Sequence, residues 1–126
     1  MSFTVERRRY PRFYVDLPIR IYGIDSFTRH YGRVINASEA GLLVYSPEKM
    51  EVGQRLKSRL SFMSDSASNA IEVLIEVVWM GLHLNEAWGD YESGVKFLDI
   101  SPEDKTMLTN FLITIAQEPS GLPGGC

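Results

Sequence analysis

The chain has 126 residues, of which 44% are hydrophobic and 23% are charged, and its formal net charge is −3. This length predicts one domain, with a core large enough to fold without a disulfide or a structural metal. No segment approaches the length of a membrane-spanning helix, and the charged N-terminus is not followed by an apolar run. We therefore expect a cytoplasmic protein that has no signal peptide and does not bind membranes.

The first predicted strand covers residues 15–22, where Val15, Leu17 and Ile19 alternate with more polar residues. Pro18 places this strand at a sheet edge or at an irregular point of the sheet, because proline has no backbone N–H to donate. Apolar alternation and turn residues predict five further strands, over residues 29–35, 42–45, 55–62, 71–84 and 91–98. Residues 64–69 are expected to form a polar loop.

The one strong helix signal begins at Ser101, where a serine suited to the N-cap is followed by Pro102 and two acidic residues. Apolar residues then recur at three- and four-residue spacing, at Met107, Leu108, Phe111, Leu112 and Ile115. This stripe predicts a helix that packs on the sheet or on a second copy of the chain, in which case the protein is a homodimer. The fold predicted is mostly β, a small closed or half-closed barrel with a C-terminal helix over residues 15–117. Residues 1–14 are expected to form a flexible arm and residues 118–126 a disordered tail.

The arm is strongly basic, with Arg7, Arg8, Arg9 and Arg12 in six positions. Guanidinium groups recognise phosphates and the Hoogsteen edge of guanine through paired donors, and they stack on planar rings. Pro11 prevents a regular helix here, so the segment can wrap a ligand. The alternative is a solvated basic arm with no ligand. Residues 60–126 contain only 2 basic residues against 10 acidic ones, which argues against duplex nucleic acid as a partner.

A second motif runs from Asn36 through Ala37 and Ser38 to Gly41. Short polar side chains at such a turn bond to nearby backbone, or to a guanine edge or a phosphate. Gly41 permits a positive φ and lets a ring approach the backbone. Taken alone, this pattern is typical of a connection between strands. Together with the arginines, it favours a compact anionic ligand that carries phosphates and planar bases.

The two motifs, R-x-x-x-R at residues 8–12 and N-x-S-x-x-G at residues 36–41, resemble those of the PilZ domain family. The segment from Gly94 to Phe97 is similar to a late G-x-x-F strand of that family, and the resemblance covers roughly residues 6–115. It implies a six-stranded antiparallel barrel, a split-barrel Greek key, that binds the bacterial second messenger cyclic di-GMP. No other cofactor and no metal is implied.

The resemblance also implies roles for the arginines. Arg8 and Arg12 would clamp phosphates and guanines, and Arg9 would add a phosphate contact. Arg7 matches a position where an arginine often accompanies an intercalated ligand dimer.

In the second motif, the resemblance implies that Asn36 and Ser38 meet a guanine edge and a phosphate, and that Gly41 gives close approach. Asn36 replaces the commoner aspartate and carries no charge, which predicts a weaker contact to guanine nitrogens. Trp79 has two interpretations: it stacks on a base, or it is a half-buried aromatic of the sheet. Gly94, inside a predicted strand, indicates that another backbone or a ligand comes close.

No catalytic constellation is visible, so an enzyme is not expected. Ser38 lacks a nucleophile-elbow context, and the acidic residues show no metal-ligand spacing. His30 and His83 stand alone and are expected to be strand or turn histidines. Cys126 is the only cysteine, and it follows a tail rich in glycine and proline that cannot position a thiol.

Three functions remain open. The leading one is a stand-alone receptor in which cyclic di-GMP orders the arm and alters a surface read by an unidentified protein in motility or biofilm control. The second is a PilZ-like interaction module that no longer binds nucleotide. The third is a small barrel that binds single-stranded nucleic acid through a basic groove and stacking aromatics, and the acidic second half of the chain disfavours it.

Overall fold

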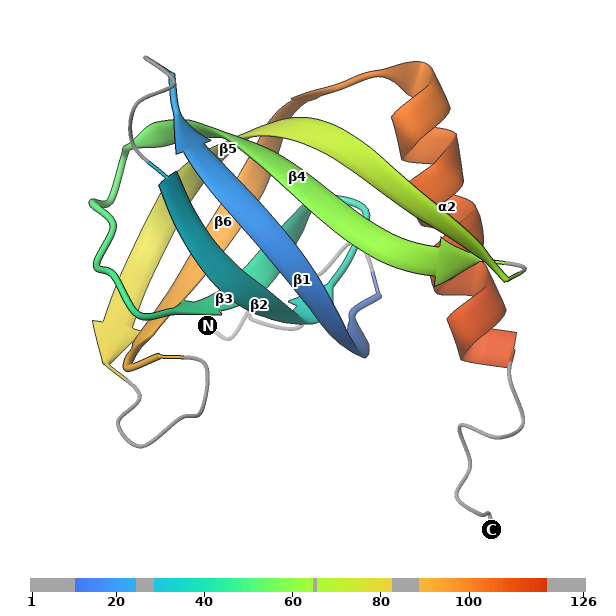
Figure 1. Cartoon of the computed structure of the whole chain (residues 1–126), viewed down its shortest axis with the longest axis horizontal. Helices are drawn as coiled ribbons and strands as arrows, with labels where there is room; N and C mark the ends of the chain where they lie inside the picture. The colour runs from blue at the N-terminus through green and yellow to red at the C-terminus, as the bar shows by residue number, and fades with distance from the viewer. Residues whose placement is uncertain (1–10, 25–28, 65, 83–88, 118–126) are drawn as a thin grey trace, which may run out of the picture.

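The computed structural model describes residues 11–24, 29–64, 66–82 and 89–117. Within them the strands are β1 (Phe13–Gly23), β2 (Arg29–Ala37), β3 (Gly41–Ser46), β4 (Arg55–Ser64), β5 (Ala67–Leu82) and β6 (Tyr91–Ile100), followed by the helix α2 (Pro102–Gln117). Figure 1 shows the strands wrapped around one another with α2 at one end. The predicted arm residues 1–10, His83 and the predicted tail lie outside the described residues.

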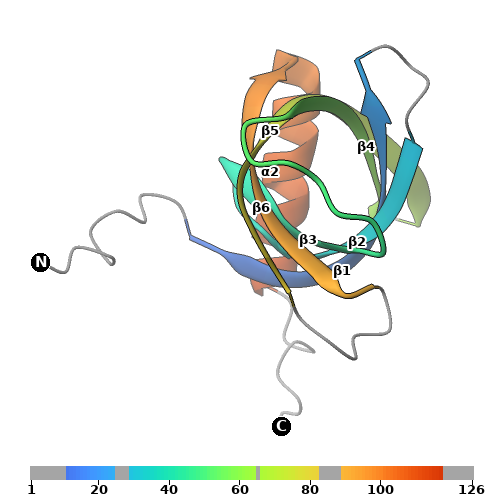
Figure 2. The same cartoon turned by 90° about the vertical axis from the view of Figure 1, so that its left-hand side faces the viewer.

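The strands form a closed barrel in the order β1-β2-β3-β6-β5-β4, and each neighbouring pair is antiparallel. Figure 2 looks along this ring of strands. The prediction of a six-stranded antiparallel barrel with a C-terminal helix is therefore confirmed. Burial alternates along β1, β4 and much of β5, and the buried residues of the barrel build one core. Its most completely buried members include Ile21, Val34, Val44, Leu56, Leu60, Ile71, Ile75 and Val77.

Several strands are longer than the sequence predicts. The expected polar loop at residues 64–69 is mostly ladder, because Ser64 pairs with Ala67 and Met63 with Ser68. Ser66 makes the tight turn possible with a φ of 64°. The apolar pattern failed here because it reports burial, and these residues pair through their backbones beyond the buried part of the barrel.

Pro18 pairs in register with Arg33 of β2 and lies next to an irregular point of β1, and a closed barrel has no edge. The β1–β2 register shifts between Tyr14 and Leu17, and pairing with β4 begins only at Ile19. Pro18 thus stands just outside the β4 ladder.

The helix closes one end of the barrel (Figure 1). The predicted cap is present, because the backbone N–H of Asp104 donates to the Ser101 hydroxyl at 3.1 Å. Leu108 and Leu112 are each 1% exposed, and the Phe111 ring packs on Phe62 of β4 with 4.5 Å between centroids. The apolar stripe therefore packs on the chain's own barrel. A homodimer through α2 stays a prediction.

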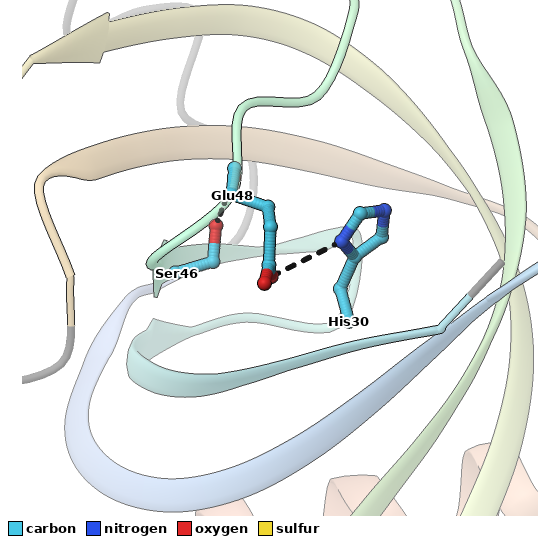
Figure 3. Close-up of polar contacts among 3 residues, drawn as sticks. All are labelled: His30, Ser46 and Glu48. Carbon is cyan, nitrogen blue, oxygen red and sulfur yellow. Dashed lines mark hydrogen bonds and ion pairs between the residues drawn. The ribbon is translucent and has the colours of Figure 1, made fainter.

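The connection between β3 and β4 closes the opposite end and inserts Met50, which is 1% exposed. Figure 3 shows two of the contacts that hold this connection. The Ser46 hydroxyl donates to the Glu48 carbonyl at 2.8 Å, and His30 Nδ1 lies 3.2 Å from Glu48 Oε1. His30 is a strand histidine, as expected. Its acidic partner comes from another strand connection, which sequence spacing could not reveal.

Candidate functional site

The turn after β2 is held together by Ser38. Its backbone N–H donates to the Gly41 carbonyl at 3.0 Å, and its hydroxyl accepts from the N–H groups of Ala40 at 3.1 Å and Gly41 at 3.3 Å. Only 3% of Ser38 is exposed. The hydroxyl thus stabilises the turn, and its predicted contact with a ligand stays a prediction.

Ala37 and Gly41 also have structural positions. Ala37 is fully buried and faces the core. Gly41 is not in the left-handed region: among the described glycines, only Gly53 and Gly89 have positive φ. A Cβ at Gly41 would overlap the carbonyl oxygen of Val95. Strand β6 therefore approaches Gly41 closely, and the expected approach of a ligand ring to this glycine stays a prediction.

Beside the turn lies a pocket of about 270 Å³ on the outside of the barrel, lined by Arg12, Asn36, Leu42, Leu43, Trp79 and Gly94. Arg12 Nη1 donates to Asn36 Oδ1 at 2.8 Å. This bond holds the arginine just before β1 against the end of β2. The two sequence motifs therefore meet in space at Arg12 and Asn36.

The strand register explains why distant residues meet here. Asn36 pairs with Leu43, Leu43 with Gly94, and Gly94 with Trp79, so one row crosses β2, β3, β6 and β5. The five-membered ring of Trp79 lies over Gly94, where any Cβ would overlap it. Trp79 is 44% exposed. It is a sheet aromatic whose remaining surface is open at the pocket.

The structure thus brings together four of the predicted site residues, Arg12, Asn36, Trp79 and Gly94. Ala37, Ser38 and Gly41 form the buried turn behind them. Arg7, Arg8 and Arg9 lie outside the described residues. Leu42 and Leu43 were missed, because an apolar pair in a short strand is the ordinary signal of core. Only the period-two alternation, which turns Leu43 outward, could have indicated its place.

The pocket combines a guanidinium, a carboxamide and an indole surface. The first two supply hydrogen-bond donors suited to phosphate and purine edges, and the third supplies a surface for stacking. No three His, Cys, Asp or Glu side chains among the described residues are grouped so as to hold a metal ion. Within the same part of the chain, no helix is both long and apolar enough to cross a membrane.

A sequence profile described as PilZ domain matches residues 6–114 of the chain. The chain belongs to the PilZ domain family. The match spans both motifs, all six strands and most of α2. No curated protein sequence matches the chain.

Solved structures share the fold at low sequence identity. The Bacillus subtilis inhibitor of motility MotI/DgrA has a TM-score of 0.73 at 16% identity, over 89% of this chain and 53% of that one. The PilZ domain of Escherichia coli YcgR with c-di-GMP has a TM-score of 0.63 at 14% identity, over 88% and 92%. The K. pneumoniae MrkH–c-di-GMP complex has a TM-score of 0.70 at 16% identity, over 90% and 54%. The chain spans about half the length of MotI/DgrA and MrkH.

Proposed function

We propose that this chain is a receptor for cyclic di-GMP and not an enzyme. The observation that carries the proposal is the pocket in which Arg12 and Asn36, one from each motif, are joined at 2.8 Å beside Trp79. Membership of the PilZ family supports it. So do the structures of YcgR and MrkH with c-di-GMP, whose folds are similar.

The bond between Arg12 and Asn36 indicates which part of the ligand each side chain would contact. Asn36 Oδ1 accepts from Arg12, so the two N–H donors of its amide are what it offers a ligand. The Hoogsteen edge of guanine presents two acceptors, N7 and O6. Asn36 would donate to this edge, and the remaining guanidinium donors of Arg12 would bind a phosphate. Here asparagine supplies donors that an aspartate lacks.

The remaining roles are proposals on residues outside the described part. Arg8 would clamp the ligand from the side opposite Arg12, and Arg9 would bind a further phosphate. Arg7 would accompany a second, intercalated ligand molecule. Ligand binding would order the arm in the cytoplasm and change a surface read by a downstream protein. The similarity to an inhibitor of motility points to motility or biofilm control.

Calorimetry with cyclic di-GMP tests the proposal. Three arginine contacts at about 1.5–3 kcal/mol each are enough for micromolar affinity. We expect Arg8→Ala and Arg12→Ala each to weaken binding about tenfold or more. The matched control is Arg55→Ala, which removes the same charge from β4, where Arg55 pairs with Glu76 at 3.4 Å. Arg55→Ala should bind like the original protein.

The stoichiometry adds a second readout. Two ligands per chain that become one in Arg7→Ala would support the intercalated dimer. No heat at tens of micromolar cyclic di-GMP would remove the proposal and favour an interaction module that does not bind nucleotide. Cyclic di-AMP, which lacks the guanine O6 acceptor, should bind much more weakly.

A further inference from the structure

The outer surface of β2, β1 and β4 carries cations and tyrosines in alternation. We call this the cationic–tyrosine face, and it consists of Arg29, Tyr31, Arg20, Tyr22, Lys57 and Arg59. Its strands lie at the front of the barrel in Figure 1, whereas β3 and β6, which carry much of the Arg12–Asn36–Trp79 pocket, lie behind. The two surfaces therefore belong to different sides of the barrel.

The register places these residues in two transverse rows. In one row Tyr22 stands between Arg29 and Lys57, and in the other Arg20 stands between Tyr31 and Arg59. Two cation–ring contacts link the strands, because the Arg20 guanidinium lies 5.8 Å from the centre of the Tyr31 ring and that of Arg29 lies 5.9 Å from the Tyr22 ring. The result is a lattice of positive charges and rings.

Folding alone does not explain this lattice. Arg20 and Arg59 are direct cross-strand neighbours, and like charges in that position destabilise a sheet. Arg59 is compensated by Glu72 at 2.8 Å. Within the part of the chain that the structure describes, Arg20, Arg29 and Lys57 form no ion pair. Three exposed cations therefore remain available to an anionic partner.

The face is also concave. A groove of about 720 Å³ runs over it, and its walls include Arg20, Arg29 and Lys57. The Tyr22 ring contributes to the lining, and Tyr31 beside it is 56% exposed. Two carboxylates, Glu72 and Asp99, line the groove on its β5–β6 side. A polyanion would thus be drawn to the β2–β1–β4 part and repelled from the other rim.

These features favour a nucleic-acid strand over a protein. Arginine and tyrosine are enriched in protein interfaces as well, but a nucleic-acid strand supplies regularly repeated phosphates for the cations together with flat bases for the rings. Proteins that bind single strands without sequence preference combine a basic groove with rings on which bases stack, and arginine adds to the stacking. The acidic second half of the chain is no objection, because the fold gathers basic residues from the first half on these three strands.

We propose that the cationic–tyrosine face binds single-stranded nucleic acid, independently of the cyclic di-GMP pocket. Arg20, Arg29 and Lys57 contact consecutive phosphates, and the open surface of Tyr31 stacks on a base. Binding is tolerant of sequence, because the cations contact phosphates and every base has a flat face on which a ring can stack.

Fluorescence anisotropy with a labelled oligouridylate of about twelve nucleotides, a length within the site sizes of small barrels, tests this. An oligothymidylate of equal length distinguishes RNA from DNA as the source of the strand. We expect saturable binding. The logarithm of the association constant should fall with the logarithm of the salt concentration with a slope of about −2, because three phosphates are neutralised. Tyr31→Ala should weaken binding about fivefold or more. Arg20→Gln should weaken it and make the slope less steep by about 0.7.

Lys57→Gln should also weaken binding. Its matched control is Lys49→Gln, because Lys49 is also exposed but lies on the connection that closes the barrel end. Equal binding by all these variants would overturn the proposal. So would equal binding of inorganic polyphosphate, which has no bases, or of a duplex of the same length. Arg12→Ala should bind the oligonucleotide normally, and Tyr31→Ala should bind cyclic di-GMP normally. These two variants separate a failure of this proposal from a failure of the receptor function.

Discussion

The two outer surfaces of the barrel are built by opposite means. The Arg12–Asn36–Trp79 pocket is made by missing side chains: Gly41 lets β6 approach β3, and Gly94 makes room for the Trp79 indole. The cationic–tyrosine face is made by added side chains that project from regular ladders on three strands. Ligand binding in the pocket therefore depends mainly on shape, whereas binding on the cationic–tyrosine face depends mainly on charge.

This difference separates the variants that damage each surface. Adding a methyl group near the pocket should disrupt it through overlap, whereas removing a charge from the face should change its affinity and leave the fold intact. In the part of the chain that the structure describes, the pocket is lined by one cation, Arg12. The cationic–tyrosine face, by contrast, carries its cations on three strands.

The largest effect is expected for Gly41→Ala. The new Cβ would overlap the Val95 carbonyl, and because that atom is backbone in the β3–β6 ladder it cannot move aside without breaking pairs. We expect the free energy of unfolding, measured by urea denaturation, to fall by about 2–3 kcal/mol. Cyclic di-GMP binding should fall with it.

Gly81→Ala is the control for this change. Its Cβ would have the Trp79 ring at 3.8 Å as its nearest neighbour, which is an ordinary contact. The stability of Gly81→Ala should stay within about 0.5 kcal/mol of the original protein. If the two variants were equally stable, shape would not be what limits the pocket.

The sequence predicted the elements of the fold well and their ends less well. Alternation at Val15, Leu17 and Ile19 and the Ser101–Pro102 cap depend on local physics, and both appear in the structure. The hairpin that joins Ser64 to Ala67 was missed, because it lies beyond the core and leaves no apolar pattern.

The pocket was predictable in part. Arg12, Asn36 and Gly94 were selected from motifs and Trp79 as an aromatic of a predicted strand, and the fold places them together. The burial of Ser38 and the contact of Gly41 with Val95 depend on the pairing of β3 with β6, which no local pattern encodes. The cationic–tyrosine face was not predicted for the same reason. Arg20 lies beside Tyr31 and Arg59 only because of the register between the strands.

A smaller and selective effect is expected for Arg12→Ala. Loss of one charge-assisted contact of about 1.5–3 kcal/mol should weaken cyclic di-GMP binding by at least about tenfold in calorimetry. Stability should change little, because the Arg12–Asn36 bond is exposed. If Arg12→Ala weakened cyclic di-GMP and oligonucleotide binding equally, the two surfaces would not be independent.

Trp79→Ala should act through stacking. An aromatic contact to a base is worth about 1–3 kcal/mol, so we expect at least about fivefold weaker cyclic di-GMP binding. Trp79→Phe keeps a ring over Gly94 and should recover most of that loss. If Trp79→Ala bound cyclic di-GMP as tightly as the original protein, Trp79 would have only a structural role in the sheet.

The smallest effect is a gain in stability in Arg20→Glu. The change replaces a like-charge pair with Arg59 by an opposite-charge pair, each worth about 0.2–1 kcal/mol. It also removes the contact with Tyr31, worth about 0.5–1 kcal/mol. The balance predicts about 0.5 kcal/mol of added stability at low salt, measured by urea denaturation. The gain should shrink at 1 M salt, where screening acts within about 3 Å.

The same variant should lose oligonucleotide binding, because a carboxylate would then stand at the centre of the face. A protein that becomes more stable as it loses a ligand indicates that the original residue serves binding at a cost to folding. If Arg20→Glu were less stable than the original protein at low salt, the Arg20–Arg59 pair would not destabilise the barrel. The cationic–tyrosine face would then need no ligand to explain it.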